Sequence, residues 1–379
     1  MKKVVVAGYA RSPFTLAKKG DLATVRPDRL AAQVVAGLVA RTGVKVDDLE
    51  DLLLGCAFPE GEQGLNMARL VALMAGLPQS VAGQTINRFC GSSMQSIHSA
   101  AGAVQMGAGE VFVCAGVESM SRVPMMGYNV LPDPDFAAQL PGAYIGMGDT
   151  AENVAARWGI TRAEMEAFAV ASHTKAAAAR AAGKFEAEIV PVVDKKGRSV
   201  SADGCIRPET TAEGLATLKP AFSATGVVTA GTSSPLTDGA SAVLVCSLDY
   251  AEKNGLEPLA AIKSIAVSGC DPEIMGIGPV GSSLKAAARA GIDVKSIDVI
   301  ELNEAFAAQA LACIRDLGLD PAKINLDGGA IALGHPLGAT GARIVGKVAS
   351  LMKREGLKTG LATQCIGGGQ GIATILEAL

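Results

Sequence analysis

The sequence predicts an α/β protein built from two similar halves, and three observations support this fold class. Its 379 residues exceed one ordinary small domain and suit two or three compact units. Hydrophobic residues make up 49% of the chain, which also has 45 glycines and one Trp, so we expect a large aliphatic core with closely packed elements. Strand-like and helix-like segments alternate before residue 119 and again after residue 259, which predicts a parallel-rich sheet covered by helices.

The elements of the first half follow from hydrophobic periodicity and turn residues. The opening run MKKVVVAGYARSPF has the lysines of a signal peptide, but its apolar part ends by Tyr9 and Arg11 follows, so we predict a buried strand. The next expected elements are a helix at 27–41, a strand at 51–58, a helix at 64–75, a strand ending near Phe89, a helix at 91–106 and a strand at 110–116. No other segment reaches membrane-spanning length without interruption.

The same order of elements recurs in the second half, although the residues themselves are not repeated. The expected elements are strands at 260–268 and 298–302, helices at 280–290, 305–317 and 339–355, and strands at 360–366 and 370–377.

The middle of the chain has a different character. Residues 120–236 hold clustered prolines and methionines ahead of a helix that opens with a capping box from Thr161 to Glu164, so we predict an inserted loop domain. The following run is expected to return to the first half as a strand and a helix. The predicted domains are therefore 1–119 together with 237–258, then 120–236, and finally 259–379.

Charge and cysteine content exclude several classes of function. A formal net charge of -3 and a pI near 5.8 supply no basic field, which argues against general nucleic-acid binding. The eight cysteines form no CxxC pair and mostly lie in apolar runs, so neither a disulfide framework nor a zinc site is indicated. We expect free thiols and a cytoplasmic protein.

One cysteine lies where a reactive thiol could be placed. In TINRFCGSSMQSIHSAAGAV, Cys90 ends an apolar strand just before a helix with small residues in its first turn. A helix N-terminus favours a thiolate, and small neighbours leave room for an acyl group. Most cysteines are simply small core residues, so a nucleophilic role for Cys90 requires a partner base.

Only one of the three histidines is placed to be that base. His98 and His173 lie inside predicted helices, where packed or solvated roles are expected. His335, in NLDGGAIALGHPLGATGAR, enters the third helix of the second half, the position that Cys90 holds in the first. If an approximate twofold relates the halves, the two helix starts converge, which suits a Cys–His nucleophile pair.

Two further segments carry polar or reactive groups. In LATQCIGGGQGIA, Cys365 ends a strand and meets glycines at 367–369, whose bare N–H groups favour an oxyanion site beside a second thiol. Nucleotide binding is disfavoured, because neither GxGxxG nor GxxxxGK[ST] is present in this run or in GHPLGATG. In ELNEAFAAQA, Asn303 follows a buried strand and serves either as a helix cap or as a site residue.

Taken together, NRFCGSSMQ, VTAGTSS, NEAFAAQ, GGAIALGHPLGATGAR and CIGGGQGIA resemble the signature segments of the thiolase family, in that family's order. The resemblance implies two βαβαβαββ halves in an α-β-α-β-α layered core with an inserted loop domain that binds coenzyme A (CoA). It also implies that Cys90 is the acylated nucleophile, that His335 is its base and that Cys365 is a second acid/base.

The resemblance also implies where the substrate's charges and groups are held. One oxyanion pocket would use His335 and a water held by Asn303, and a second would use the N–H groups of Cys90 and Gly367. CoA contacts carried over by position are Met147, Arg207, Ala230, Ser234 and Phe306. The Arg207 guanidinium can stack on adenine or meet phosphate, and its alternative is an ordinary surface arginine. CoA would be a substrate, and no metal or redox cofactor is expected.

The segments RPETTAEGLATLKPAF and CDPEIMGIGPV resemble the degradative thiolases that cleave 3-ketoacyl-CoA in fatty-acid β-oxidation. Gly146 departs from the His of biosynthetic acetoacetyl-CoA thiolases, which are the first alternative. Decarboxylating ketoacyl synthases are a second alternative, and Cys365 with CIGGG speaks against them. An acyl-CoA or lipid carrier on the same scaffold is the non-enzyme alternative. A homodimer or homotetramer, with a possible β-oxidation partner enzyme, is expected, and chain length and physiological direction stay open.

Overall fold

The computed structural model describes residues 2–379, and its strands form one continuous mixed sheet in the order β10-β11-β12-β9-β1-β8-β5-β3-β4, with β2 beside β8. The strands of this sheet are β1 (Val4–Arg11), β2 (Thr15–Leu16), β3 (Asp51–Gly55), β4 (Ala82–Ile86), β5 (Val111–Ser119), β8 (Thr237–Ser247), β9 (Ala260–Gly269), β10 (Val299–Leu302), β11 (Thr359–Ile366) and β12 (Gln370–Glu377). A separate small hairpin joins β6 (Val192–Val193) to β7 (Ser199–Val200).

The strand order shows the internal repeat. The first strands of the two halves, β1 and β9, pair antiparallel at the centre, where Val5 faces Ala261. Outward from this junction, the two halves place corresponding strands in the same order. The first half has β8, β5 and β3, and the second half has β12, β11 and β10. In each half these are the last strand, the strand that follows the inner helix and the strand that follows the outer helix. The first half continues to β4, whereas the second has only a single bridge between Ile300 and Ile324 at that place. The predicted repetition of elements is therefore confirmed.

The sheet is less parallel than predicted. Parallel pairing joins β3 to β4 and β5, and β10 to β11, but β8 and β12 run antiparallel to both of their neighbours. The prediction of a parallel-rich sheet was therefore wrong for the last strand of each half. In the second half the cause is local, because the tight turn at 367–369 folds β12 straight back on β11.

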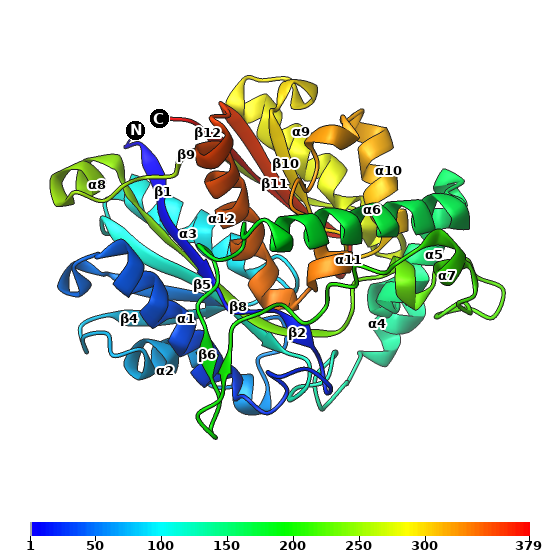
Figure 1. The fold of residues 1–379 in the computed structure, drawn as a ribbon, viewed down its shortest axis with the longest axis horizontal. Helices are drawn as coiled ribbons and strands as arrows, with labels where there is room; N and C mark the ends of the chain where they lie inside the picture. The colour runs from blue at the N-terminus through cyan, green and yellow to red at the C-terminus, as the bar shows by residue number, and fades with distance from the viewer. Residues whose placement is uncertain (1) are drawn as a thin grey trace.

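Helices cover both outer faces and fill the space between the two half-sheets (Figure 1). The long helices are α1 (Pro27–Thr42), α2 (Met67–Met74), α3 (Ser92–Met106), α5 (Met147–Trp158), α6 (Arg162–Ala181), α9 (Gly278–Ala290), α10 (Ala307–Leu317) and α12 (Leu337–Glu355), and the short ones are α4 (Pro134–Gln139), α7 (Ala212–Ala216), α8 (Leu248–Asn254) and α11 (Ala330–Leu333). The helices α1 and α2 cover the first half-sheet, and α9 and α10 cover the second. Between the sheets α3 packs on α12, which is buried along most of its length. The layers are helix, sheet, helix, sheet and helix, as the resemblance implied.

The segment 120–236 contains α4 to α7 and the small hairpin; α5 and α6 fold beside α10 of the second half, whereas the hairpin lies beside α1 of the first half. Its helix α6 begins with the predicted capping box, in which Thr161 and Glu164 each accept a backbone N–H of the other. An apolar cluster joins α5 and α6 to the start of α10. After this segment β8 and α8 form the strand and helix that the sequence predicted over 237–258.

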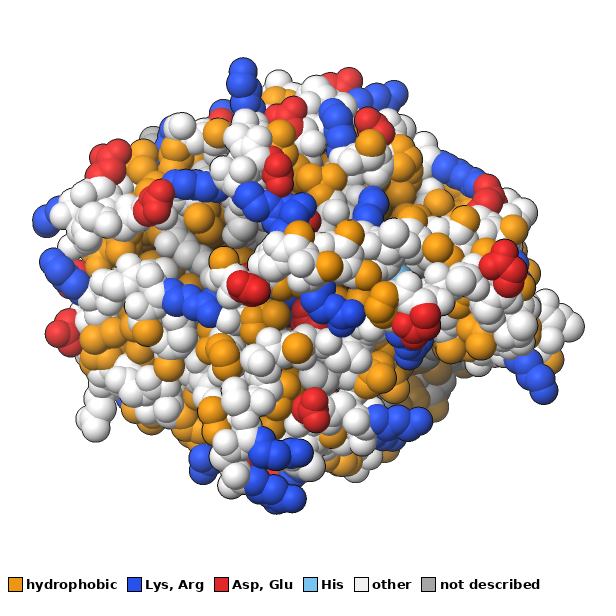
Figure 2. All heavy atoms as spheres, in the orientation of Figure 1, with side chains coloured by type: hydrophobic (Ala, Val, Ile, Leu, Met, Phe, Trp, Pro, Cys, Tyr) orange, Lys and Arg blue, Asp and Glu red, His pale blue; other side chains and the backbone are white. Residues whose placement is uncertain are grey.

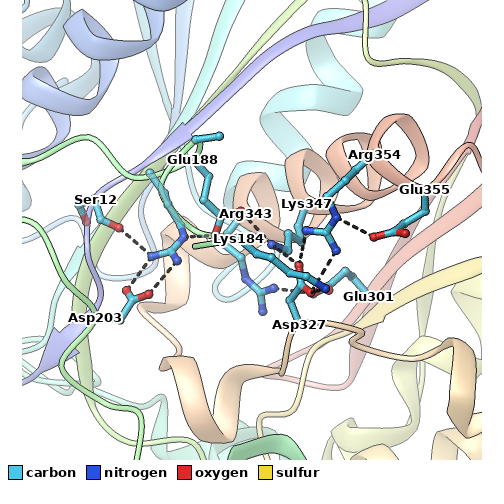
Figure 3. A network of polar contacts seen from close by, with 12 residues as sticks. Ser12, Lys184, Glu188, Asp203, Glu301, Asp327, Arg343, Lys347, Arg354 and Glu355 are labelled. Atoms are coloured by element: carbon cyan, nitrogen blue, oxygen red, sulfur yellow. Dashed lines mark hydrogen bonds and ion pairs between the residues drawn. The ribbon is translucent and has the colours of Figure 1, made fainter. Parts of the chain in front are cut away.

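A buried network of charges ties the inserted segment to the core (Figure 3). Arg11 of β1 bonds Asp203 at 2.7 Å and Glu188 at 2.8 Å, both from the inserted segment. Lys347 of α12 lies 3.0 Å from Glu188 and 2.9 Å from Asp327. Because an unpaired buried charge is costly, these pairs hold the inserted segment in one position against α12.

The surface is mixed in charge, with basic and acidic side chains interspersed over the face in Figure 2. No helix among residues 2–379 is both long and apolar enough to cross a membrane. All eight cysteines, each of them within the described residues, are free.

Candidate active site

Cys90 lies in a tight turn between β4 and α3. The preceding residue, Phe89, has φ of +43°, a left-handed conformation that is strained for a bulky side chain. Ser92 stabilises this turn, because its hydroxyl donates to the Phe89 carbonyl and accepts the Arg88 N–H at 2.9 Å. A side chain at position 91 would be crowded, because a Cβ added to Gly91 would lie 2.5 Å from Ile366 Cδ1. The turn presents Cys90 at the start of α3, as the sequence predicted.

The thiol of Cys90 is held between two strand ends. The backbone carbonyl of Cys90 accepts a hydrogen bond from the Gln364 side chain, and the Cys90 sulfur accepts the Gly367 N–H. Burial raises the pKa of Cys90 to about 12, although the Gly367 N–H lowers it. The expectation that the helix N-terminus favours a thiolate is therefore wrong for the resting protein. Desolvation of the charged sulfur outweighs the helix field, so Cys90 is a thiol that needs a base.

His335 is held on three sides at the entrance to α12. Its N–H donates to Thr237 Oγ1 at 3.1 Å, and its preceding residue Gly334 has φ of +104°, which a side chain rarely adopts. Its ring Nδ1 lies 2.6 Å from Thr340 Oγ1, and Nε2 lies 3.4 Å from Asn303 Nδ2. Only 4% of His335 is exposed. Burial, assisted by the positive charge of Arg343, lowers its pKa to about 3, so the imidazole is neutral.

The starts of α3 and α12 meet in the central layer, as the repeat predicted. Ser93 Oγ accepts the Ala342 N–H at 2.9 Å, which links the first turn of α3 to the second turn of α12. A Cβ on Gly341 would lie 2.4 Å from the Met94 nitrogen, so the two backbones touch. The other two histidines are packed, as expected: His98 bonds Thr374 and His173 accepts the Arg207 N–H.

Cys365 ends β11 and is 1% exposed. It belongs to the apolar cluster that contains Phe306 and borders Met147. Burial raises its pKa well above the ordinary value, and the next contribution comes from charge on Cys90, so the two thiols lie close together. Two residues on, Gly367 brings its N–H to Cys90, and a Cβ added to that glycine would lie 3.4 Å from Met147 Sδ.

Asn303 is not a helix cap. The helix α10 begins only at Ala307, whereas the fully buried Asn303 side chain faces His335 and leaves its Oδ1 without a partner in the protein. The adjacent Glu304 is also buried, and it accepts the Asn325 amide at 2.7 Å and the Ile331 N–H at 3.1 Å. Glu304 thereby fixes the loop that leads to His335, a role that the sequence did not reveal.

A cavity of about 510 Å³ opens onto Cys90 and Gly367. Its wall is mostly apolar and comes largely from the inserted segment. The apolar lining consists of Ala57, Phe58, Pro59, Phe89, Met125, Met126, Val130, Leu131, Pro132, Phe136, Ala143, Tyr144, Ile145, Met147 and Leu337. This cavity was not predicted, because its wall combines segments that are far apart in the chain.

Four of the five expected CoA contacts lie outside the wall of this cavity, three of them in the inserted segment and Phe306 at the start of α10. The Ser234 N–H donates to the Ala305 carbonyl at 3.0 Å, and Phe306 packs edge-on against Phe222, so this stretch adjoins the Cys365 cluster. Ala230 and Arg207 are exposed. Of the five expected contacts, Met147 alone also lines the cavity at Cys90.

A partly buried thiol at the start of one central helix, a neutral imidazole at the start of the other, a second, buried thiol and donors for an oxyanion suit acyl transfer through a thioester. Residues 4–249 match the family model of the thiolase N-terminal domain, and residues 256–378 match that of the thiolase C-terminal domain. The chain therefore belongs to the thiolase family of acyltransferases.

Relatives along the full length agree with this assignment. The chain is 48% identical to a 3-ketoacyl-CoA thiolase of Bacillus subtilis and 49% identical to one of Aliivibrio fischeri, in each case over 100% of both chains. A crystal structure of the Bacillus anthracis acetyl-CoA acetyltransferase is similar at a TM-score of 0.92 and 41% identity, covering 100% of this chain and 99% of that one.

Proposed function

We propose that this protein cleaves 3-ketoacyl-CoA with CoA, giving acetyl-CoA and an acyl-CoA shortened by two carbons. The observation that carries the proposal is the second buried thiol, Cys365, beside Cys90. Thiolysis needs one group that forms the acyl-enzyme and another that moves protons at the leaving carbon and at the entering thiol. Full-length relatives near 48% identity that carry the name 3-ketoacyl-CoA thiolase support the same reaction.

In the first half-reaction, Cys90 attacks the 3-keto carbon while its proton passes to Nε2 of His335. The pKa of Cys90 is about 12 and that of His335 is about 3, so neither the Cys90 thiolate nor the His335 imidazolium is favoured by itself. Proton transfer from Cys90 to His335 and attack of the sulfur on the 3-keto carbon must therefore proceed together. The bond between the α-carbon and the 3-keto carbon then breaks. Its electron pair leaves as the enolate of acetyl-CoA, which takes a proton from the Cys365 thiol.

In the second half-reaction, the Cys365 thiolate takes the proton of an incoming CoA thiol. The CoA sulfur attacks the thioester on Cys90, a new thioester forms, and the Cys90 sulfur leaves. The leaving sulfur recovers its proton from His335, so both thiols and the imidazole return to their starting states. The buried Cys365 thiolate is costly, which limits it to a short-lived state.

Two sets of donors are available for the oxyanions. The Gly367 N–H already points at the Cys90 sulfur and, with the Cys90 N–H, would face an oxygen on the attacked carbon. On the other side, the Asn303 amide lies 3.4 Å from His335 Nε2 and could hold a water next to it. This second pair would bind the enolate oxygen of acetyl-CoA.

The cavity at Cys90 supports a preference for substrates longer than four carbons. The expected CoA contacts Arg207, Ala230, Ser234 and Phe306 lie outside its wall, so it is free to take the acyl chain. About 510 Å³ of mostly apolar space exceeds the need of an acetyl group. An enzyme that cleaves medium-chain substrates fits a place in fatty-acid β-oxidation, and we propose that role in the cytoplasm.

We further propose that the protein acts as a homodimer or homotetramer. The strand β4 ends the sheet, and its residues are exposed or only partly buried. An edge of this kind presents unpaired backbone groups that a second copy can cover. Acetoacetyl-CoA synthesis remains the alternative direction of the same chemistry, and the similar Bacillus anthracis structure bears the corresponding name.

The test is to find the acyl-enzyme and then measure its substrate range. Mass spectrometry after incubation with acetyl-CoA should locate a single acetyl group on the peptide of Cys90, and Cys90→Ala should abolish it. Thiolysis across 3-ketoacyl-CoAs of increasing length should give kcat/KM at least as high for a medium chain as for acetoacetyl-CoA. An adduct on another cysteine would disprove the role of Cys90, and activity restricted to four carbons would favour the biosynthetic alternative.

A further inference from the structure

The hydroxyl of Thr340 is the closest side-chain partner of the proposed base. Thr340 lies in the first turn of α12, five residues after His335, and is completely buried. Its Oγ1 lies 2.6 Å from His335 Nδ1, which is a strong hydrogen bond. Which of the two atoms donates decides the state of the other ring nitrogen, because a neutral imidazole has one N–H and one lone pair.

The surroundings of Thr340 favour one direction of this bond. Its hydroxyl also lies 3.4 Å from the carbonyl of Pro336, a group that can only accept. A hydroxyl has a single proton, so when Thr340 donates to Pro336 it must accept from His335. The imidazole proton is then on Nδ1.

The contact at the other ring nitrogen, Nε2, favours the same tautomer. The atom next to His335 Nε2 is the Asn303 Nδ2 at 3.4 Å, and an amide nitrogen only donates. A donor facing Nε2 requires a lone pair there. Both ends of the ring therefore favour the same tautomer, with the proton on Nδ1 and the lone pair on Nε2.

We propose that Thr340 is a positioning residue that holds His335 in the tautomer able to take the proton of Cys90. This inference rests on the proposed function, because it concerns the base of that reaction. It adds a group that touches neither substrate nor the reacting atoms. The neutral charge state of His335 makes the point important, since burial lowers its pKa to about 3 and leaves the tautomer as the property that distinguishes an active from an inactive ring.

Removing the hydroxyl should have a specific result. In Thr340→Val the shape of the side chain is kept, but an Nδ1–H would face a methyl group in a buried site. An unpaired buried N–H is costly, so the proton should shift to Nε2, where water or substrate oxygen can accept it. An Nε2–H ring cannot accept the Cys90 proton. Acylation by acetyl-CoA should slow about 10- to 100-fold, with KM for acetyl-CoA changed less than about twofold.

Two matched variants separate this effect from general damage. Thr340→Ser keeps the hydroxyl and should acylate within about threefold of the wild type. Ser241→Ala removes a buried hydroxyl that donates to the Ala339 carbonyl in the same first turn of α12 but does not contact His335. It should also retain near-normal acylation. If Thr340→Val does not fold, Thr340→Ala makes the same test with a smaller side chain.

The tautomer itself can be measured without activity. In protein labelled with ¹⁵N-histidine, the His335 signals, assigned by their loss in His335→Ala, should report Nδ1–H in the wild type and in Thr340→Ser. Thr340→Val should move the signals toward the Nε2–H form. An unchanged tautomer, or acylation by Thr340→Val as fast as by Ser241→Ala, would overturn the inference. Absence of an acyl-enzyme in the wild type would instead refute the proposed function, while the tautomer measurement would still stand.

Discussion

Replacing Cys365 by alanine should separate two steps that ordinary damage to the site would not separate. The change removes the sulfur atom of a residue that is 1% exposed and leaves the Gln364 and Gly367 contacts of Cys90 in place. Loss of a general acid/base typically slows a reaction about 10²- to 10⁴-fold, which is about 3–5 kcal/mol in the activation barrier. The empty space left by one small buried group costs about 1 kcal/mol of stability, so the protein should stay folded.

The assay follows each step by itself. Acylation of Cys90 by acetyl-CoA needs no proton at the α-carbon, and the CoA sulfur can leave as a thiolate without a proton from Cys365, so mass spectrometry should still find the adduct in Cys365→Ala. Thiolysis of a 3-ketoacyl-CoA and exchange of the α-protons of acetyl-CoA into D₂O both need that proton and should collapse. Cys313→Ala is the matched control, because Cys313 is also buried and near Cys365 but lies in the outer core. Near-normal thiolysis by Cys365→Ala would refute the two-thiol mechanism.

Two further changes test binding and stability. Arg207→Ala should raise KM for CoA esters by the equivalent of about 1–3 kcal/mol and leave kcat nearly intact, since a remote contact acts equally on ground and transition states; a fall in kcat alone would contradict this. Asp327→Asn should destabilise the protein in urea at pH 7. Burial opposes ionisation of Asp327, but Arg354 and Lys347 lower its pKa to about 2. The lowered pKa contributes at most about 2 kcal/mol to the free energy of unfolding, because Arg354 is partly exposed to solvent. Because the folded pKa is depressed, this stability is present above the unfolded pKa near 4 and is lost as pH falls toward 2, so the variant and wild type should converge in acid. Glu257→Gln, on the surface, should cost less than about 0.5 kcal/mol at either pH.

The positions of the helices and strands were largely predictable, because the hydrophobic period that identifies each element is a local property of the sequence. The predicted helix at 91–106 is observed at 92–106, the strand predicted at 360–366 begins one residue earlier, and the strand at 370–377 has the predicted bounds. The predicted strand at 51–58 is too long, because the observed strand β3 ends at Gly55. In the loop that follows, the buried Glu118 carboxylate accepts the N–H groups of Ala57 and Phe58. That contact joins residues about sixty positions apart, so no local pattern reveals it.

The charge states of the site were decided by tertiary structure. A helix start beside Cys90 was visible in the sequence and favoured a thiolate, but burial by β11 and the neighbouring turn raises the pKa of the thiol instead. The partners of His335 were equally hidden. Thr237 and Thr340 look like ordinary strand and helix residues, and only the folded chain brings their hydroxyls to one imidazole.

By itself, the sequence determined the order of the elements and the presence of two related halves, and it predicted which side chains react, because these depend on residue type and spacing along the chain. The tertiary structure decided the pairing of β8 with β1 and β5, the cavity beside Cys90 and the protonation of the thiol and imidazole. Each of these depends on which distant segments pack together, and the two protonation states depend further on the exclusion of water from the sulfur and the ring, so they are properties of the packed chain rather than of any stretch of it.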